Sequence, residues 1–150
     1  MREEVYEFFK EYGFNRDEIH YFQDENQEMY FTNMIEVNKN IDFLINKGLN
    51  KEEIMQVFRV DPYMITVKNN RLDALDKIYL EDLKLTKDEL KQLIINNPDT
   101  YISSPIELNK CIDYLKEHHY SMNIIKNFLL NNPQLVSISL EKFKNVVKIN

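Results

Sequence analysis

The chain has 150 residues, of which 43% are hydrophobic, with a net charge of −6, one cysteine and two glycines. This length predicts one domain over residues 1–150 that buries roughly 70% of its unfolded surface, and the apolar content excludes intrinsic disorder. Because Cys111 has no partner for an intramolecular disulfide, we expect a reducing, cytoplasmic location. No apolar run approaches the length of a membrane-spanning helix, and the acidic start is unlike a signal or transit peptide.

The charge is unevenly placed along the chain. Residues 1–35 contain three basic and nine acidic side chains, residues 36–110 sum to −2 and residues 111–150 sum to +2. An acidic chain repels phosphate at long range, which disfavours nucleic acid as a ligand. The ordinary alternative is that the charge serves solubility.

An internal repeat begins with the heptapeptides GFNRDEI at 13–19 and GLNKEEI at 48–54, which contain both glycines. Shifts of 35, 36 and 35 residues align four copies, and we call each aligned position a slot. The first slot is a tight turn, occupied by Gly13, Gly48, Lys84 and His119. We expect positive φ at Gly48, so Gly48→Val should cost at least ~1 kcal/mol, and Gly13→Val less, since the terminal copy can fray.

A helix follows the turn in each copy. Its N-cap slot can accept a hydrogen bond from the first turn, and it holds Asn15, Asn50, Thr86 and Ser121. A glutamate three residues later predicts a capping box in three copies: Glu18, Glu53 and Glu89. The fourth copy has Ile124 there. Apolar residues recur at i, i+3 spacing, which predicts a buried helix face, and the helix ends at Pro62, Pro98 and Pro133, with Gln27 in the first copy.

A second helix completes each copy. Its predicted caps are Asn33, Asn69, Ser104 and Ser139, and in SPIE at 104–107 Glu107 is expected to complete a capping box. This helix is expected to bury neighbouring side chains together: Phe8–Phe9, Phe43–Leu44, Tyr79–Leu80 and Tyr114–Leu115. The segments after the prolines predict a 3₁₀ turn or an extended linker. The spacing places helices near 2–12, 16–26, 34–46, 51–60, 70–83, 87–96, 105–118, 122–131 and 140–149.

The predicted fold class is therefore all-α. Amphipathic helix pairs cannot bury their faces alone, so successive pairs must stack. The sequence predicts a short α-solenoid of about four helix-pair repeats, with a period of 35–36 residues, plus a closing helix.

The repeated unit, G-φ-[N/T/S]-x-x-E-φ-x-x-φ-φ-x-x-(N/D)-P-x-φ-φ, resembles that of the mTERF family, the mitochondrial transcription termination factors and their relatives. It is carried by GLNKEEIMQVFRVDPYMI, KLTKDELKQLIINNPDTYI and HYSMNIIKNFLLNNPQLV. The resemblance implies two helices and a short 3₁₀ segment per unit, stacked in a curved superhelix. It also implies nucleic-acid binding along a concave, basic surface, whereas this chain is acidic.

The sequence gives little support for catalysis or for a cofactor. His118 and His119 point about 100° apart on a helix and cannot grip one metal together, and His20 is expected to face solvent. Cys111 lies within a helix and is expected to be buried and inert. Two glycines are too few for a phosphate-binding loop. We expect no enzyme activity, no cofactor, no metal site and no small-molecule substrate.

Two groups of side chains are candidate binding residues. Basic residues near the end of the chain are candidates for nucleic acid, with a solvated surface as the alternative: Lys116, Lys126, Lys142, Lys144 and Lys148. Tyrosines of the acidic first unit are candidates for a protein partner, since tyrosine is enriched at interfaces, with a place in the core as the alternative: Tyr6, Tyr12, Tyr21 and Tyr30.

Three functions remain open at this point. The leading prediction is a non-catalytic helical-repeat protein that binds a macromolecule, with protein favoured over nucleic acid as the partner. The alternative is mTERF-like nucleic-acid binding and regulation of gene expression through the basic end. The third is an acidic inhibitor of a nucleic-acid enzyme, whose N-terminal charge mimics phosphate.

Overall fold

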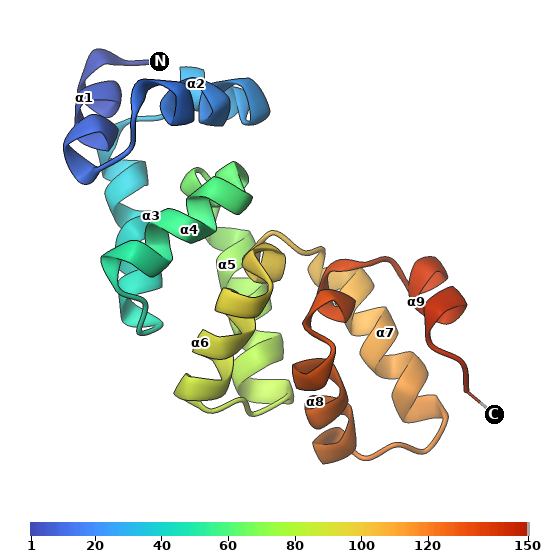
Figure 1. The fold of residues 1–150 in the computed structure, drawn as a ribbon. Coiled ribbons are helices and arrows are strands. Elements are labelled where there is room, and N and C mark those ends of the chain that lie inside the picture. Colours follow the sequence, from blue (N-terminus) through green and yellow to red (C-terminus); the bar gives the residue numbers. More distant parts are fainter. Residues whose placement is uncertain (150) are drawn as a thin grey trace. The chain divides into compact units, whose positions relative to one another are not determined.

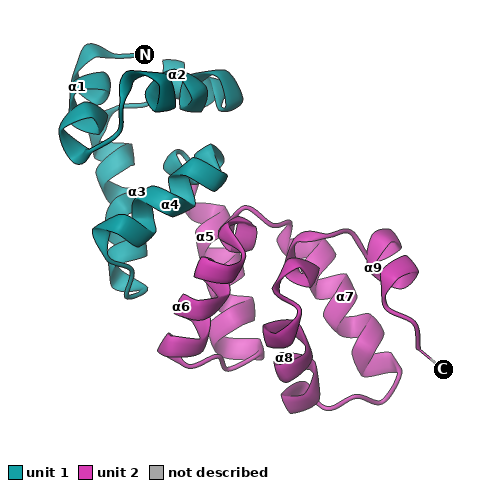
Figure 2. Cartoon of the chain, viewed as in Figure 1, with its two compact units in different colours: residues 1–67 teal, residues 68–150 magenta. Residues whose placement is uncertain are grey.

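The computed structural model describes residues 1–149, and these residues form nine α-helices, five short 3₁₀ or π segments and no strand (Figure 1). The all-α prediction is confirmed. The chain divides into two compact units, Met1–Val67 and Lys68–Asn150 (Figure 2). Each unit has its own buried apolar residues. That the whole chain is one domain and one continuous solenoid stays a prediction.

Unit 1 consists of two helix pairs, each followed by a 3₁₀ segment. Its elements are α1 (Glu3–Tyr12), α2 (Arg16–Glu25), η1 (Gln27–Tyr30), α3 (Met34–Asn46), α4 (Lys51–Val60) and η2 (Pro62–Ile65). The second pair stacks on the first, because α2 contacts both α4 and η2. Four buried phenylalanines fill the core with ring centroids 4.9–6.5 Å apart, and most of them meet edge to face: Phe9, Phe14, Phe22 and Phe58.

Unit 2 repeats this plan and adds a last helix. Its elements are α5 (Asn69–Asp76), the π-helical η3 (Lys77–Asp82), α6 (Lys87–Asn96), η4 (Pro98–Tyr101), α7 (Pro105–Glu117), α8 (Met122–Asn131), η5 (Pro133–Ser137) and α9 (Leu140–Val146). Stacking of its two pairs follows from the contacts of α5 with α7 and of η4 with η5, and α9 packs on α7.

The predicted capping pattern is confirmed for the helix that follows each tight turn: α2, α4, α6 and α8. The capping boxes of Asn15 with Glu18, Asn50 with Glu53 and Thr86 with Glu89 are all closed in both directions. Ser121 caps α8 alone, accepting from the Ile124 amide at 3.3 Å. These local bonds satisfy amides that the first helical turn leaves free, which explains why each helix begins where the sequence predicts.

All four tight-turn slots have positive φ. The angles are 128° at Gly13, 94° at Gly48, 55° at Lys84 and 68° at His119, so the prediction for Gly48 is confirmed. The residue after the turn donates its amide back to the preceding helix, as Phe14 does to Phe9 O at 3.0 Å. This is the Schellman ending of a helix, which normally favours glycine.

The one longer shift, of 36 residues, has a physical cause in unit 2. The predicted cap at Asn69 is wrong: the N-cap of α5 is Lys68, which makes no side-chain cap bond. The extra residue is instead accommodated by η3 and the turn after it. The Leu83 amide donates to Ile78 O, five residues back, and the Leu85 amide donates to Tyr79 O, six residues back, both at 2.9 Å. A π segment is a single wider turn with i→i+5 bonds, which takes up one residue more than an α-helical turn.

The paired burial expected in the second helices is also wrong. One member of each pair is buried and its neighbour is half-buried or exposed, because adjacent residues on a helix point about 100° apart. The buried members are Phe9, Leu44, Tyr79 and Leu115.

An asparagine ties the two repeats together in each unit. Asn26 Nδ2 donates to Pro62 O at 3.0 Å and to Thr66 Oγ1 at 2.9 Å. Asn97 Nδ2 donates to Pro133 O at 3.0 Å and to Ser137 Oγ at 2.8 Å. Both asparagines precede the proline slot of their own repeat, and we call these two sets of bonds the asparagine clamps.

Candidate binding surfaces

The structure brings only two of the five candidate lysines to one cavity. Lys142 and Lys148 both line it, whereas Lys116 is exposed at the end of α7. Lys126 forms an ion pair with Glu89 at 2.9 Å, and Lys144 Nζ lies 5.1 Å from the Tyr114 ring centroid, a cation–π contact. The structure therefore brings Lys142 and Lys148 to one cavity and gives each of the other three a different setting.

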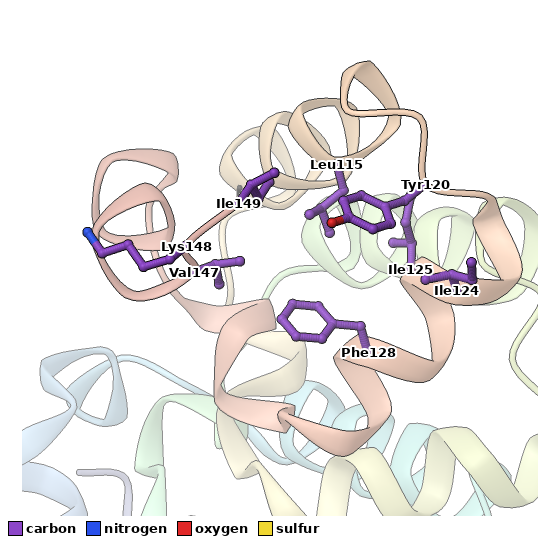
Figure 3. Close-up of a pocket in the computed structure, with 8 residues that line it drawn as sticks. All are labelled: Leu115, Tyr120, Ile124, Ile125, Phe128, Val147, Lys148 and Ile149. Carbon is purple, nitrogen blue, oxygen red and sulfur yellow. The ribbon is translucent and has the colours of Figure 1, made fainter.

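The end of unit 2 carries two adjacent cavities. The smaller, of about 160 Å³, is lined by side chains that are apolar except for one lysine: Leu115, Tyr120, Ile124, Ile125, Phe128, Val147, Lys148 and Ile149 (Figure 3). The larger, of about 490 Å³, shares Phe128, Val147 and Lys148 with it and adds Lys142. We call the two together the terminal groove. The stem of Lys148 lies beside Val147, and its ammonium points away from Leu115 and Phe128 (Figure 3), as expected of a long cationic side chain at an apolar site.

The closing helix was predicted to reach residue 149, which is wrong. α9 ends at Val146, and the three residues after it form one wall of the smaller cavity instead of another helical turn. The apolar pattern of Val147 and Ile149 fits a helix as well as an extended wall, so the sequence alone could not distinguish them.

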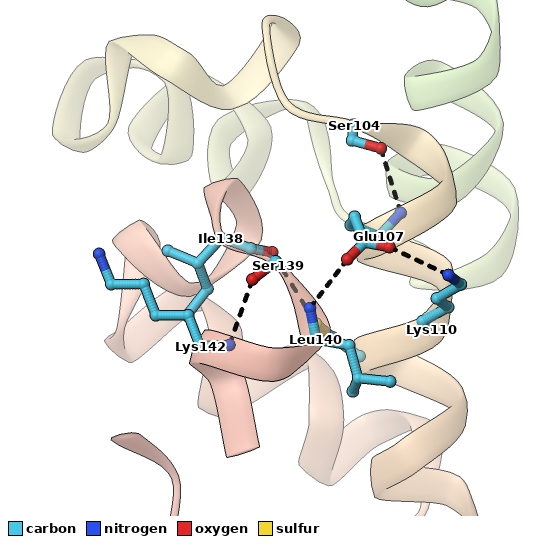
Figure 4. Close-up of polar contacts among 8 residues, drawn as sticks. Ser104, Glu107, Lys110, Ile138, Ser139, Leu140 and Lys142 are labelled. Carbon is cyan, nitrogen blue, oxygen red and sulfur yellow. Dashed lines mark hydrogen bonds and ion pairs between the residues drawn. The ribbon is translucent and has the colours of Figure 1, made fainter. Parts of the chain in front are cut away.

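The start of α9 is fixed by two bonds at its N-terminus (Figure 4). Ser139 Oγ accepts from the Lys142 amide at 3.2 Å, which confirms that cap. Glu107 accepts from the Leu140 amide at 3.2 Å and pairs with Lys110, so it does not complete the capping box predicted with Ser104. The bond from Leu140, with Lys110 second, lowers the pKa of Glu107.

The four candidate tyrosines divide into two kinds. Tyr6 and Tyr12 are half-buried, and Tyr12 stacks on Phe8 and Phe14. Burial, and then the nearby charge of Glu52, raises the pKa of Tyr12. Tyr21 and Tyr30 are exposed. Tyr12 thus packs at the edge of the core, and Tyr21 and Tyr30 are the two of the four that are most open to a partner.

Two further exposed side chains escaped the sequence analysis. Phe31, which directly follows Tyr30, is 74% exposed, and Ile35, in the first turn of α3, is 80% exposed. The residues from 17 to 38 include six carboxylates and no lysine or arginine. We call this stretch, with its exposed Tyr21, Tyr30, Phe31 and Ile35, the acidic surface. Ile35 lies on the exposed face of α3, whereas apolar periodicity indicates the buried face of a helix, so the pattern does not mark this residue.

The one cysteine, Cys111, is not activated as a nucleophile. Cys111 is buried, and burial raises the pKa of its thiol to about 11, which keeps it protonated at neutral pH. Within residues 1–149 no group of three or more histidine, cysteine, aspartate or glutamate side chains could hold a metal ion. None of the helices in that same range is long and apolar enough to cross a membrane.

Comparison with known proteins agrees with the repeat architecture. The mTERF family model matches residues 1–146. No curated protein matches the chain. The family match covers all nine helices of the described residues. The chain is therefore a helical-repeat protein that belongs to the mTERF family.

Proposed function

We propose that this protein is a non-catalytic binding protein whose partner is another protein, and that it acts in the cytoplasm. The observation that carries the proposal is the acidic surface of unit 1, where large apolar side chains stand exposed among carboxylates. Large exposed apolar side chains are typical of protein–protein interaction sites, and tyrosine and phenylalanine are enriched there.

Charge supports a protein over a nucleic acid at this surface. From residue 17 to residue 38 every charged side chain is a carboxylate, so a phosphate backbone would be repelled along the whole stretch. Two of these groups are engaged internally, since Glu18 pairs with Arg59 and Glu36 accepts from Thr32 Oγ1 at 2.9 Å. The other four are exposed and can act on an incoming partner: Asp17, Asp24, Glu25 and Glu28.

Site-specific photo-crosslinking tests the proposal on the full chain. A benzophenone amino acid at Phe31 should yield one crosslinked protein product in nuclease-treated cells, and the yield should fall when Ile35→Ser is added. The matched control carries the same group at Tyr63, an exposed aromatic of unit 1 outside the acidic surface. Equal products from both positions, or a product that nuclease removes, would contradict the proposal.

Nucleic-acid binding is the second candidate function, and family membership favours it. It would use the positively charged end of the chain, where Lys142 and Lys148 line one cavity. Electrophoretic mobility of duplex DNA, single-stranded DNA and RNA across a range of salt concentrations separates the two functions. Binding that weakens steeply with salt would favour the second.

A further inference from the structure

We propose that the terminal groove of unit 2 is a docking site for a single helix of a partner protein, apolar along one face and carrying aspartate or glutamate beside it. This site is separate from the acidic surface. It explains why lysines accompany an apolar cavity at this end of the chain.

The first step is the burial of one slot across the four repeats. Phe22, Val57 and Leu93 are all buried at this slot. In the fourth repeat Phe128 is only half-buried and lines both cavities. In unit 1 the side chain at this slot, Phe22, packs on Phe9 and Phe14. Phe58 of α4, a helix of the following repeat, packs on the same two rings, with centroids 6.3 and 6.5 Å away. Their equivalents in the fourth repeat, Leu115 and Tyr120, line the smaller cavity. The uncovered slot in α8 therefore offers the surface on which a helix packs elsewhere in this chain.

The second step is a change of residue type at the slot four positions earlier in the same helix. The first three repeats place a glutamate there, and each closes a capping box: Glu18, Glu53 and Glu89. The fourth repeat has Ile124, so α8 forgoes half of its cap. The side chain gained in exchange is 53% exposed and lines the smaller cavity. An apolar residue that stabilises neither the cap nor the core is suited to an intermolecular contact.

The third step is charge. Lys142 and Lys148 are the only charged side chains that line the terminal groove within the described residues. They stand beside an apolar floor, with the Lys148 ammonium directed outward (Figure 3). An apolar helix face would fill the floor, and its carboxylates would meet the two ammonium groups. The floor combines aliphatic side chains with the rings of Tyr120 and Phe128, and the larger cavity adds Asn132 and Gln134. A phosphate backbone gains nothing from the aliphatic part, which includes Ile124, so the geometry favours an acidic amphipathic helix over phosphate.

Fluorescence anisotropy with a designed peptide tests the proposal. The probe is a helical peptide of about 18 residues, five turns long, with leucines at i, i+3, i+4 and i+7 and glutamates flanking them. The full-length protein should bind it, and a peptide with lysines in place of the glutamates should bind at least about fivefold more weakly, the scale of exposed charge pairs. Ile124→Asp should weaken binding at least about tenfold, as for an interface hot spot.

Controls separate docking from folding and from other occupants. Lys142→Glu with Lys148→Glu should reverse the preference between the two peptides, whereas Lys77→Glu with Lys87→Glu, two exposed lysines of unit 2 outside the groove, should not. Circular dichroism checks that each variant keeps the helical content of the wild type. The proposal is overturned if neither peptide binds, if duplex DNA binds and competes through the same lysines, or if gel filtration shows that Ile124 mediates self-association of the free protein.

Discussion

The two units share the asparagine clamp but differ in net charge and in how deeply the clamp is buried. Asn26 is fully buried beside an aromatic core, and unit 1 has seven basic and fourteen acidic residues. Asn97 is 9% exposed and its partner Ser137 also bonds Ser103 at 2.9 Å, in a unit with twelve basic and eleven acidic residues. The clamp, which both units have, therefore holds neighbouring repeats together. The surface charge, which could meet partners, is what differs between the units.

The largest effect is expected from breaking the clamp in unit 1. Asn26→Ala would leave the Pro62 carbonyl and the Thr66 hydroxyl buried without their donor, and should lower the free energy of unfolding by ~2–3 kcal/mol. Asn97→Ala should cost only ~1 kcal/mol, because water can reach its partners more easily. Urea unfolding of the two variants measures both values. Equal losses would mean that burial does not distinguish the two clamps.

The four tight-turn slots give the next largest effects. At Gly13 an added Cβ would lie 3.0 Å from Met55 Cε, at a φ of 128°. Gly13→Ala should therefore destabilise by ~1–2 kcal/mol and Gly48→Ala by ~1 kcal/mol, which reverses the order expected from fraying of the first repeat.

The same slots in unit 2 should respond in the opposite direction. Lys84 and His119 adopt left-handed φ values that side chains disfavour, so Lys84→Gly and His119→Gly should each raise the free energy of unfolding by up to ~1 kcal/mol. Thermal and urea unfolding check the sign. A loss of stability in both would contradict the equivalence of the four slots.

A smaller difference is expected in acid. The cap bond from Asn15, followed by Arg59, lowers the pKa of Glu18, and the cap bond from Thr86, followed by Lys126, lowers that of Glu89. A carboxyl whose pKa is lowered by folding stabilises the fold above its ordinary value of 4.5, and this contribution is lost as pH falls through the folded pKa.

Glutamine keeps the capping shape and removes that charge. Glu18→Gln and Glu89→Gln should each cost less than ~1 kcal/mol at pH 7, since both carboxyls are partly exposed. The difference from the wild type should vanish at low pH. Urea unfolding at a series of pH values measures this, with Asp24→Asn, an exposed carboxylate of α2, as the control. A difference that persists at low pH would assign the effect to packing.

Local signals predicted most of the fold. Caps, tight turns and prolines act on the nearest helical turn. A single residue such as Asn15 or Pro105 was therefore enough to predict where a helix starts. The cap of α5 was predicted one residue late because Asn69 is a good cap residue, and the sequence could not show that Lys68 is the N-cap. The clamps join residues 36 and 40 positions apart, and the sequence analysis interpreted the proline slots only as helix ends, so these long-range bonds were not predicted.

The binding surfaces were less predictable than the helices. Tyr12 and Tyr21 have the same residue type in the same acidic stretch, yet one stacks in the core and the other is exposed. Lys126 and Lys142 are likewise the same residue type in different settings. Lys126 pairs with Glu89, whereas Lys142 lines the larger cavity. Such differences depend on packing between repeats, which a single repeat pattern does not encode.

The most direct test of the account is whether the protein binds nucleic acid at all. Fluorescence anisotropy with duplex DNA, single-stranded DNA and RNA at physiological salt should show no binding by the wild type. Replacing Lys142, Lys144 and Lys148 by glutamine should leave stability nearly unchanged. Tight binding by the wild type that is lost in the triple variant, with the salt slope for duplex DNA reduced by up to ~2.7, would contradict the account and establish the nucleic-acid function instead.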